Sequence, residues 1–215
     1  MSSTADLLEV LLRNEISAVC AAVEGALSTN APRPAVLLPG SFNPVHEGHW
    51  RLAEVGAALV GGPAAFELSV VNVDKPALSA AEVCRRLAQF ARRAPLWITR
   101  APTFAEKASL FPGVVFVVGA DTAERLAMPR YYHNSEAGMA EAFARVRHLG
   151  CRFLVAGRED SSGRFVDLDG LSIPANFRDL FSSIPQSAFQ ISLSSTALRQ
   201  RGGDNGSVAP VDQSG

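Results

Sequence analysis

Short apolar runs alternate with helical patterns along most of this chain, and this alternation restricts its fold more than any other feature. Apolar runs of strand length predict β-strands over 35–38, 66–73, 96–99, 114–118 and 152–156. Helical spacing between them predicts helices near 47–60, 79–94, 103–110, 121–127 and 135–149. Such repetition needs right-handed crossovers, so we expect an α/β fold, a Rossmann-like parallel sheet with helices on both faces. Ligands of such sheets bind at the carboxyl ends of the strands.

The ends of the chain are expected to lie outside this α/β unit. Apolar residues at helical spacing predict an N-terminal amphipathic helix, assigned to 1–30, which either packs on the main domain or forms an interface in a homo-oligomer. One main domain over 34–201 fits a chain of 215 residues. Charged and small residues at 158–169 indicate a surface excursion before a last helix near 194–201. The tail 202–215 has no periodicity and is predicted to be disordered.

The composition argues against several classes of partner. Because 20 basic and 21 acidic residues give a net charge of -1, no overall field attracts nucleic acid or an anionic membrane. No stretch approaches the roughly 20 apolar residues that cross a bilayer. Cys20, Cys84 and Cys151 are far apart and form no CxxC pair, which suits a reducing compartment. We therefore expect a cytoplasmic protein without nucleic-acid or membrane partners.

The decapeptide GSFNPVHEGH, residues 40–49, follows the first predicted strand directly and enters a helix. Gly40 permits a tight turn and close approach of a ligand, and a helix N-terminus presents free N–H groups to an anion. His46 and His49, at i and i+3, lie on one helix face and can donate hydrogen bonds to phosphate oxygens. A lone HxxH is more often structural, and a zinc site would need further ligands nearby. The whole string favours a phosphate site, and we predict no metal ligands.

GSFNPVHEGHW resembles the (H/T)xGH signature of the nucleotidylyltransferase superfamily, and especially of its nicotinamide mononucleotide adenylyltransferase branch. The resemblance implies the nucleotidylyltransferase fold, with His46 and His49 as catalytic groups that stabilise charge on the phosphates. It also implies ATP contacts and an acceptor contact, the former from Gly40, Ser41, Phe42 and Gly48 and the latter from Asn43.

A second family signature, ISSTxxR, resembles ISLSSTALR near the C-terminus, where Leu193 separates the first Ile-Ser from the SSTALR core. The resemblance implies that Ser194, Ser195 and Thr196 open a phosphate-binding helix. It implies further that Arg199 is a catalytic group reaching the β and γ phosphates of ATP. Serine and threonine are good N-cap residues, and arginine neutralises phosphate in a forked geometry. Taken alone, SSTALR is more often a plain capped helix.

Other candidate residues follow predicted strands. Gly119 and Asp121 resemble the family's GxD segment, so Asp121 is expected to accept bonds from ribose hydroxyls or amino groups, or to cap the next helix. The family carries a lysine placed like Lys75, which is expected to meet a phosphate as a catalytic group; the alternative is a solvated lysine. Arg158 is expected to approach ATP, or to be solvated.

The acceptor is expected near the end of the strand 96–99. Family members that bind a pyridine ring place an aromatic or polar contact there, which implies that Trp97 and Thr99 contact the acceptor. An aromatic residue on a strand is otherwise more often part of the core.

The resemblance spans roughly 36–199 and implies adenylyl transfer. In the implied reaction, an acceptor phosphate oxygen is expected to attack the α-phosphorus of ATP, which is bound with Mg²⁺, and to displace pyrophosphate without a protein nucleophile. The expected acceptor is nicotinamide mononucleotide or nicotinic acid mononucleotide. The alternatives are another branch, such as a cytidylyltransferase or a phosphopantetheine adenylyltransferase, and a non-catalytic regulatory protein that binds nucleotides.

Overall fold

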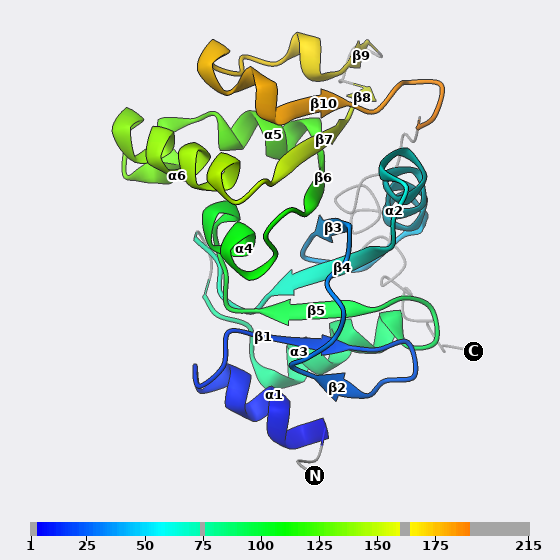
Figure 1. The fold of residues 1–215 in the computed structure, drawn as a ribbon. Coiled ribbons are helices and arrows are strands. Elements are labelled where there is room, and N and C mark those ends of the chain that lie inside the picture. The colour runs from blue at the N-terminus through cyan, green and yellow to red at the C-terminus, as the bar shows by residue number, and fades with distance from the viewer. Residues whose placement is uncertain (1–3, 74–75, 160–163, 190–215) are drawn as a thin grey trace, which may run out of the picture.

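The computed structural model describes residues 4–73, 76–159 and 164–189. Within them, an eight-stranded sheet has the order β10-β7-β6-β3-β4-β5-β1-β2 (Figure 1). Its parallel strands are β3 (Val36–Pro39), β4 (Ala64–Ser69), β5 (Leu96–Thr99), β6 (Val115–Gly119), β7 (Arg152–Ala156) and β10 (Phe181–Ser183). The predicted α/β class with a mostly parallel sheet is confirmed.

Helices follow the strands close to where their spacing predicts them. They are α2 (Glu47–Val60), α3 (Ala80–Leu87), α4 (Phe104–Leu110), α5 (Ala120–Leu126) and α6 (Glu136–His148). Short 3-10 helices lie between them, namely η1 (Ala88–Phe90), η2 (Pro129–Tyr132), η3 (Leu168–Gly170) and η4 (Ala175–Leu180). No helix in the described part of the chain is both long enough and apolar enough to span a membrane.

Some boundaries differ from the predictions. The helix predicted over 79–94 is divided into α3 and η1, and the strand predicted over 66–73 ends at Ser69. In the predicted surface excursion, β8 (Arg158–Glu159) and β9 (Phe165–Val166) form a small antiparallel pair. The helix and tail predicted after residue 193 lie outside the described residues.

The helix predicted over 1–30 is wrong beyond its first third. α1 (Thr4–Leu12) ends because Asn14 adopts a left-handed conformation (φ 65°), with the Glu15 N–H bonded to the Val10 carbonyl and the Asn14 N–H bonded to the Leu11 carbonyl. This pattern is the Schellman motif, which stops a helix. The chain then forms β1 (Ala18–Ala21) and β2 (Leu27–Ser28), which extend the sheet antiparallel beyond β5.

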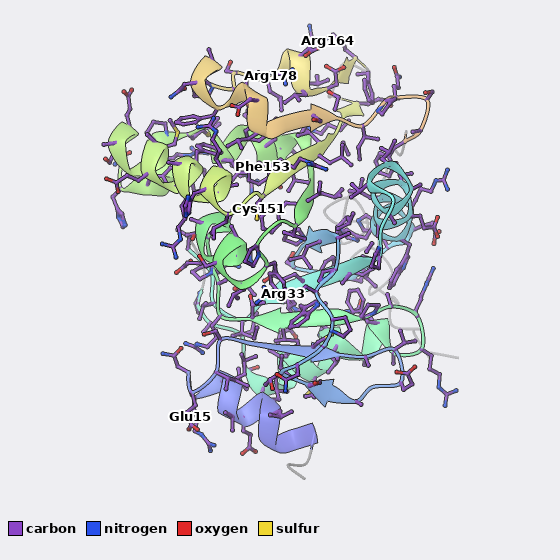
Figure 2. The ribbon with its side chains drawn as sticks, viewed as in Figure 1. Glu15, Arg33, Cys151, Phe153, Arg164 and Arg178 are labelled. Atoms are coloured by element: carbon purple, nitrogen blue, oxygen red, sulfur yellow. The ribbon has the colours of Figure 1, made fainter. Side chains whose placement is uncertain are left out.

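Alternate residues of the strands point to opposite faces of the sheet, and helices cover both faces. α1, α2 and α3 cover the face that carries Leu38 and Phe66, whereas α4, α5 and α6 cover the face that carries Leu37 and Phe153. Figure 1 shows α2 on one side of the sheet and α4 and α6 on the other. Phe153, labelled on β7 in Figure 2, packs against Phe143 of α6 with ring centroids 6.4 Å apart.

The direction of winding reverses between β3 and β6. The chain adds β4 and β5 on one side of β3 and then returns to the other side with β6, β7 and β10. The β3–β6 ladder pairs Val36 with Val115 and Leu37 with Phe116, short of the carboxyl ends of both strands. A parallel sheet that reverses in this way opens a crevice at the reversal, where ligands bind.

Gly56 lets α2 lie close to β3 and β6. A Cβ atom at this position would lie 2.7 Å from Cγ2 of Val117 and 3.2 Å from Cγ1 of Val36. Both neighbours are β-branched residues with restricted χ1 rotation. The helix axis therefore sits closer to the sheet than a larger residue would allow, and this sets the position of the helix N-terminus.

Gly56→Ala is expected to lower the free energy of unfolding by about 1 kcal/mol. Overpacking costs about 1–3 kcal/mol, which exceeds the gain in helix propensity of about 0.5–1 kcal/mol. Urea denaturation measures the change. Gly138→Ala in α6 is the matched control, because a Cβ there meets its nearest atoms at an ordinary 3.4 Å. A Gly56→Ala protein as stable as Gly138→Ala would contradict the close packing of α2.

Candidate functional site

The loop after β3 is built around the buried ring of Phe42. The Gly40 N–H donates to the Glu67 carbonyl of β4 at 2.9 Å, and a Cβ at Gly40 would lie 2.6 Å from the Phe42 ring. Phe42 has a positive φ of 44° and packs edge-to-face on Phe66 and Phe90. Glycine is therefore required at position 40 because the Phe42 ring occupies the space of a side chain.

Side chains from the end of α3 and from η1 hold this loop. Oε1 of Gln89 accepts from the Val45 N–H at 2.9 Å, and Nε2 of Gln89 donates to the Phe42 carbonyl at 3.0 Å. Nη1 of the buried Arg86 donates to the Ser41 carbonyl at 2.7 Å. Sequence reasoning missed both residues, because a contact between positions more than 40 apart leaves no local pattern.

The two histidines lie at the start of α2. His46 is the N-cap residue, and its N–H donates to Nδ1 of His49 at 3.1 Å. Since Nδ1 accepts this bond, the proton of a neutral His49 lies on Nε2, which is then a hydrogen-bond donor. The two rings are 3.8 Å apart between centroids, and the Phe42 ring packs edge-to-face on His49 at 5.2 Å.

Both imidazoles are neutral at pH 7. Burial, and then the neighbouring His46, lower the pKa of His49 to about 4, and burial also lowers the pKa of His46. Nδ1 of His46 is buried and has no hydrogen-bond partner in the described part of the protein. The pair therefore offers neutral donors that are already desolvated.

A cavity of about 440 Å³ lies at the reversal between β3 and β6, next to these histidines. This volume is within the usual range for small-molecule sites. Several predicted residues line it together, namely Gly40, Ser41, His46, Gly48, His49, Gly119, Asp121 and Arg158. Asp121 and Arg158 form an ion pair with each other, with Nε of Arg158 2.6 Å from Oδ1 of Asp121.

Other predicted residues lie outside the described part of the chain. These are Lys75, Ser194, Ser195, Thr196 and Arg199. Phe189, the last described residue before the second signature, lines the cavity.

The expected ligand contacts from three residues do not fit their positions. Phe42 lies in the core below the loop, 1% exposed, where its ring supports His49 instead of reaching the cavity. Trp97 is buried and packs edge-to-face on Phe111 at 5.0 Å. Thr99 is fully buried and donates to Glu67, which also accepts from Nζ of Lys107 at 2.8 Å. β5 is covered on both faces, so its side chains complete the core.

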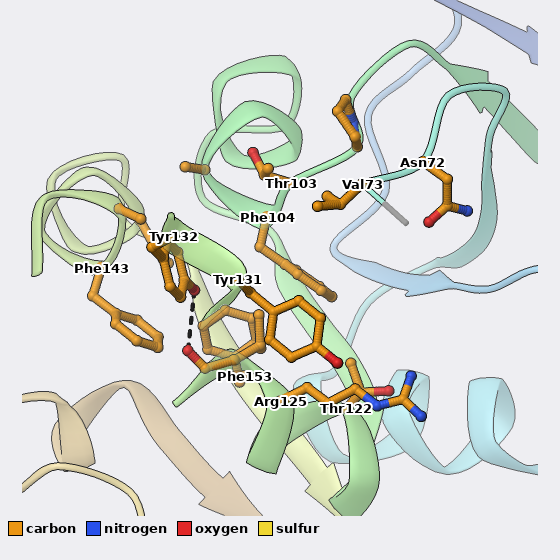
Figure 3. A pocket seen from close by; sticks show the side chains of 15 residues that line it. Asn72, Val73, Thr103, Phe104, Thr122, Arg125, Tyr131, Tyr132, Phe143 and Phe153 are labelled. Carbon is orange, nitrogen blue, oxygen red and sulfur yellow. Dashed lines mark hydrogen bonds between the residues drawn. The ribbon is translucent and has the colours of Figure 1, made fainter. Parts of the chain in front are cut away.

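A second cavity, of about 170 Å³, lies between α4, α5, η2 and α6 (Figure 3). Its aromatic lining consists of Phe104, Tyr131, Tyr132, Phe143 and Phe153. The Tyr132 hydroxyl donates to the Leu126 carbonyl at 3.0 Å, shown as a dashed line in Figure 3. Thr122 and Arg125 of α5 line both this cavity and the first one.

The predicted acceptor residue Asn43 lies elsewhere, on a third cavity of about 530 Å³ that Ser41 and Arg86 also line.

Gln89→Leu is expected to destabilise the protein by about 1–3 kcal/mol, because it leaves the Val45 N–H and the Phe42 carbonyl without their partner. Gln89→Glu should lose less stability, because it keeps an acceptor for the Val45 N–H. Gln186→Leu at an exposed site is the matched control, with an expected change within about 0.5 kcal/mol. Equal denaturation midpoints for the three variants and the parent would show that Gln89 does not hold the loop.

Stability is expected to fall as the pH drops from 6.5 toward 4. In this window the unfolded His49, with its usual pKa of 6.5, binds a proton that the folded protein excludes. The contribution of the neutral His49 to the free energy of unfolding is complete above pH 6.5 and is lost near pH 4. Its size is on the order of 2–3 kcal/mol. His49→Gln, which keeps an acceptor for the His46 N–H, should show a shallower decline of unfolding free energy between pH 7 and pH 4. Parallel curves of unfolding free energy against pH for the parent and His49→Gln would contradict the lowered pKa of His49.

The comparisons with known proteins agree with this geometry at the level of the family. A search of curated proteins finds no match to the chain. A family model described as cytidylyltransferase-like matches residues 37–201, more than half of the chain and a range that includes both signature segments. This match supports a nucleotidyltransferase activity and leaves the nucleotide and the acceptor open. The chain therefore belongs to the cytidylyltransferase-like family of the nucleotidylyltransferase superfamily.

Proposed function

We propose that this protein transfers the adenylyl group of ATP to nicotinamide mononucleotide or nicotinic acid mononucleotide and releases pyrophosphate. The observation that carries the proposal is the junction of two different cavities at α5. One, at the β3–β6 reversal, is lined by both histidines and the start of α2, and the other is aromatic. A phosphate-binding cavity beside an aromatic one suits a nucleotide donor and an acceptor that carries a flat ring.

The proposed reaction needs positioning and charge stabilisation, and no covalent intermediate. An oxygen of the acceptor phosphate attacks the α-phosphorus, the bond from that phosphorus to the bridging oxygen of the β-phosphate breaks, and pyrophosphate leaves. Nε2 of His49 and the free N–H groups at the start of α2 would donate to the phosphate oxygens. Because both imidazoles are neutral, they bind the anion without giving up a proton.

The aromatic cavity is the proposed site of the acceptor ring, in place of Trp97 and Thr99. Its rings offer the stacking and edge-to-face contacts that a pyridine prefers, and the hydroxyl of Tyr131 points toward the shared residues Thr122 and Arg125. An acceptor bound with its ring here would direct its phosphate toward the first cavity.

Mg²⁺ enters this proposal as part of the nucleotide. It keeps several water ligands and is usually held by phosphates with one or two carboxylates. Asp121 is the carboxylate among the described residues that line the first cavity, so it would hold the ion or its water after releasing Arg158. Mg²⁺ would neutralise the triphosphate during the attack.

A panel of substrates tests the proposal. The family match is equally compatible with cytidylyl transfer and with other acceptors, so ATP and CTP are each combined with nicotinamide mononucleotide, nicotinic acid mononucleotide and phosphopantetheine. Pyrophosphate release and product mass identify the reaction. Release with ATP and a pyridine mononucleotide supports the proposal. Turnover of another combination of nucleotide and acceptor would assign the protein to the branch of the superfamily that catalyses that reaction. Tight ATP binding without pyrophosphate release in any mixture would indicate a regulatory nucleotide-binding protein.

His49→Ala is expected to lower kcat about 10²- to 10³-fold, because it removes a positioned donor to the transition-state charge. Steady-state pyrophosphate release measures the loss. His148→Ala, at the exposed C-terminal end of α6, is the matched control and should keep full turnover. Full turnover in the His49→Ala protein would remove His49 from the mechanism.

A further inference from the structure

Arg125 stands where the two cavities meet. It lies on α5, one helical turn after Asp121, and lines both the cavity at the strand reversal and the aromatic cavity. Figure 3 shows the Tyr131 hydroxyl pointing toward the end of the aromatic cavity where Arg125 and Thr122 lie. A ligand that extends from one cavity into the other must therefore pass this guanidinium.

The guanidinium of Arg125 has no ion pair or side-chain hydrogen bond with any other described residue. Asp121, its i−4 neighbour, would be the usual helical partner. Oδ1 of Asp121 is instead bound by Nε of Arg158 at 2.6 Å, so Arg158 satisfies the carboxylate from the neighbouring strand end. The arrangement leaves a fork of N–H donors available at the junction.

Arg125 also gives the aromatic cavity its positive charge. Among the described residues that line that cavity, Arg125 is the one charged side chain, and the others are aromatic, aliphatic or neutral polar. An apolar chamber with a cation at one end fits an amphipathic ligand, with a flat apolar part inside and an anionic group at the cation.

We propose that Arg125 binds the phosphate of the acceptor and holds its attacking oxygen toward the α-phosphorus of the nucleotide. This inference rests on the proposed function, because it assigns the two cavities to donor and acceptor. A guanidinium pairs with phosphate through two parallel hydrogen bonds, which fix orientation as well as position. Arg125 thereby selects phosphorylated acceptors over the corresponding nucleosides.

A thermodynamic cycle tests this contact directly. Calorimetric titration compares nicotinamide mononucleotide with nicotinamide riboside on the parent protein and on Arg125→Gln. If Arg125 holds the phosphate, the variant should lose about 10- to 100-fold in affinity for the mononucleotide and little for the riboside. Arg125→Lys should recover part of the loss, because it restores the charge without the fork.

Kinetics and a second probe complete the design. The KM for the mononucleotide should rise by a similar factor in Arg125→Gln, while the KM for ATP stays within about twofold. Arg145→Gln on α6, an exposed arginine that donates to Ser109, is the control for loss of one positive charge. Inorganic phosphate is titrated as a probe that needs no acceptor, with ATP present to occupy the phosphate site beside His49, and its affinity should fall in Arg125→Gln alone.

The outcomes separate this inference from the proposed function. Equal losses for mononucleotide and riboside, or an unchanged affinity for inorganic phosphate in Arg125→Gln, would overturn the role of Arg125. Absence of binding and turnover with every pyridine mononucleotide would overturn the proposed acceptor, and the inorganic phosphate titration would still decide whether Arg125 holds a phosphate.

Discussion

The reversal of strand order between β3 and β6 is the constraint on which the site depends. Because the two strands pair only through their first two residues, their carboxyl ends leave a cavity between them, and the loops that follow must line it. α2 begins at that point and is held close to the sheet by Gly56, so its first turn and both histidines face the cavity. The position of the chemistry thus follows from backbone topology and from one close helix–sheet contact.

The loop between β3 and α2 combines a rigid interior with neutral donors. Phe42 fills the space beneath Gly40 and packs on His49, while Gln89 satisfies the backbone on both sides of the bend. The same burial that stabilises this loop lowers the pKa of His49, so the imidazole is a donor and not a cation at neutral pH. A site preorganised in this way loses little free energy to rearrangement when phosphate charge develops.

Local patterns predicted the strands from β3 to β7 and the helices α2 to α6, because each has a clear period and most are bounded by turn or cap residues. They did not predict β1 and β2, since Val19 in β1 also fits the helical period that Asn14 interrupts. β10 was missed as well, a three-residue strand whose partner β7 is far away in sequence.

The sequence by itself determined the family of this protein, because the two signature segments GSFNPVHEGH and ISLSSTALR each lie within about ten consecutive residues. Only the tertiary structure decided which aromatic residues surround the second cavity and which stay in the core. Trp97 is buried on a strand whose two faces are both covered, whereas Tyr131 lies beside a cavity that exists only when α4, α5 and α6 pack together. Burial depends on contacts between distant segments, and no local pattern of residues records those contacts.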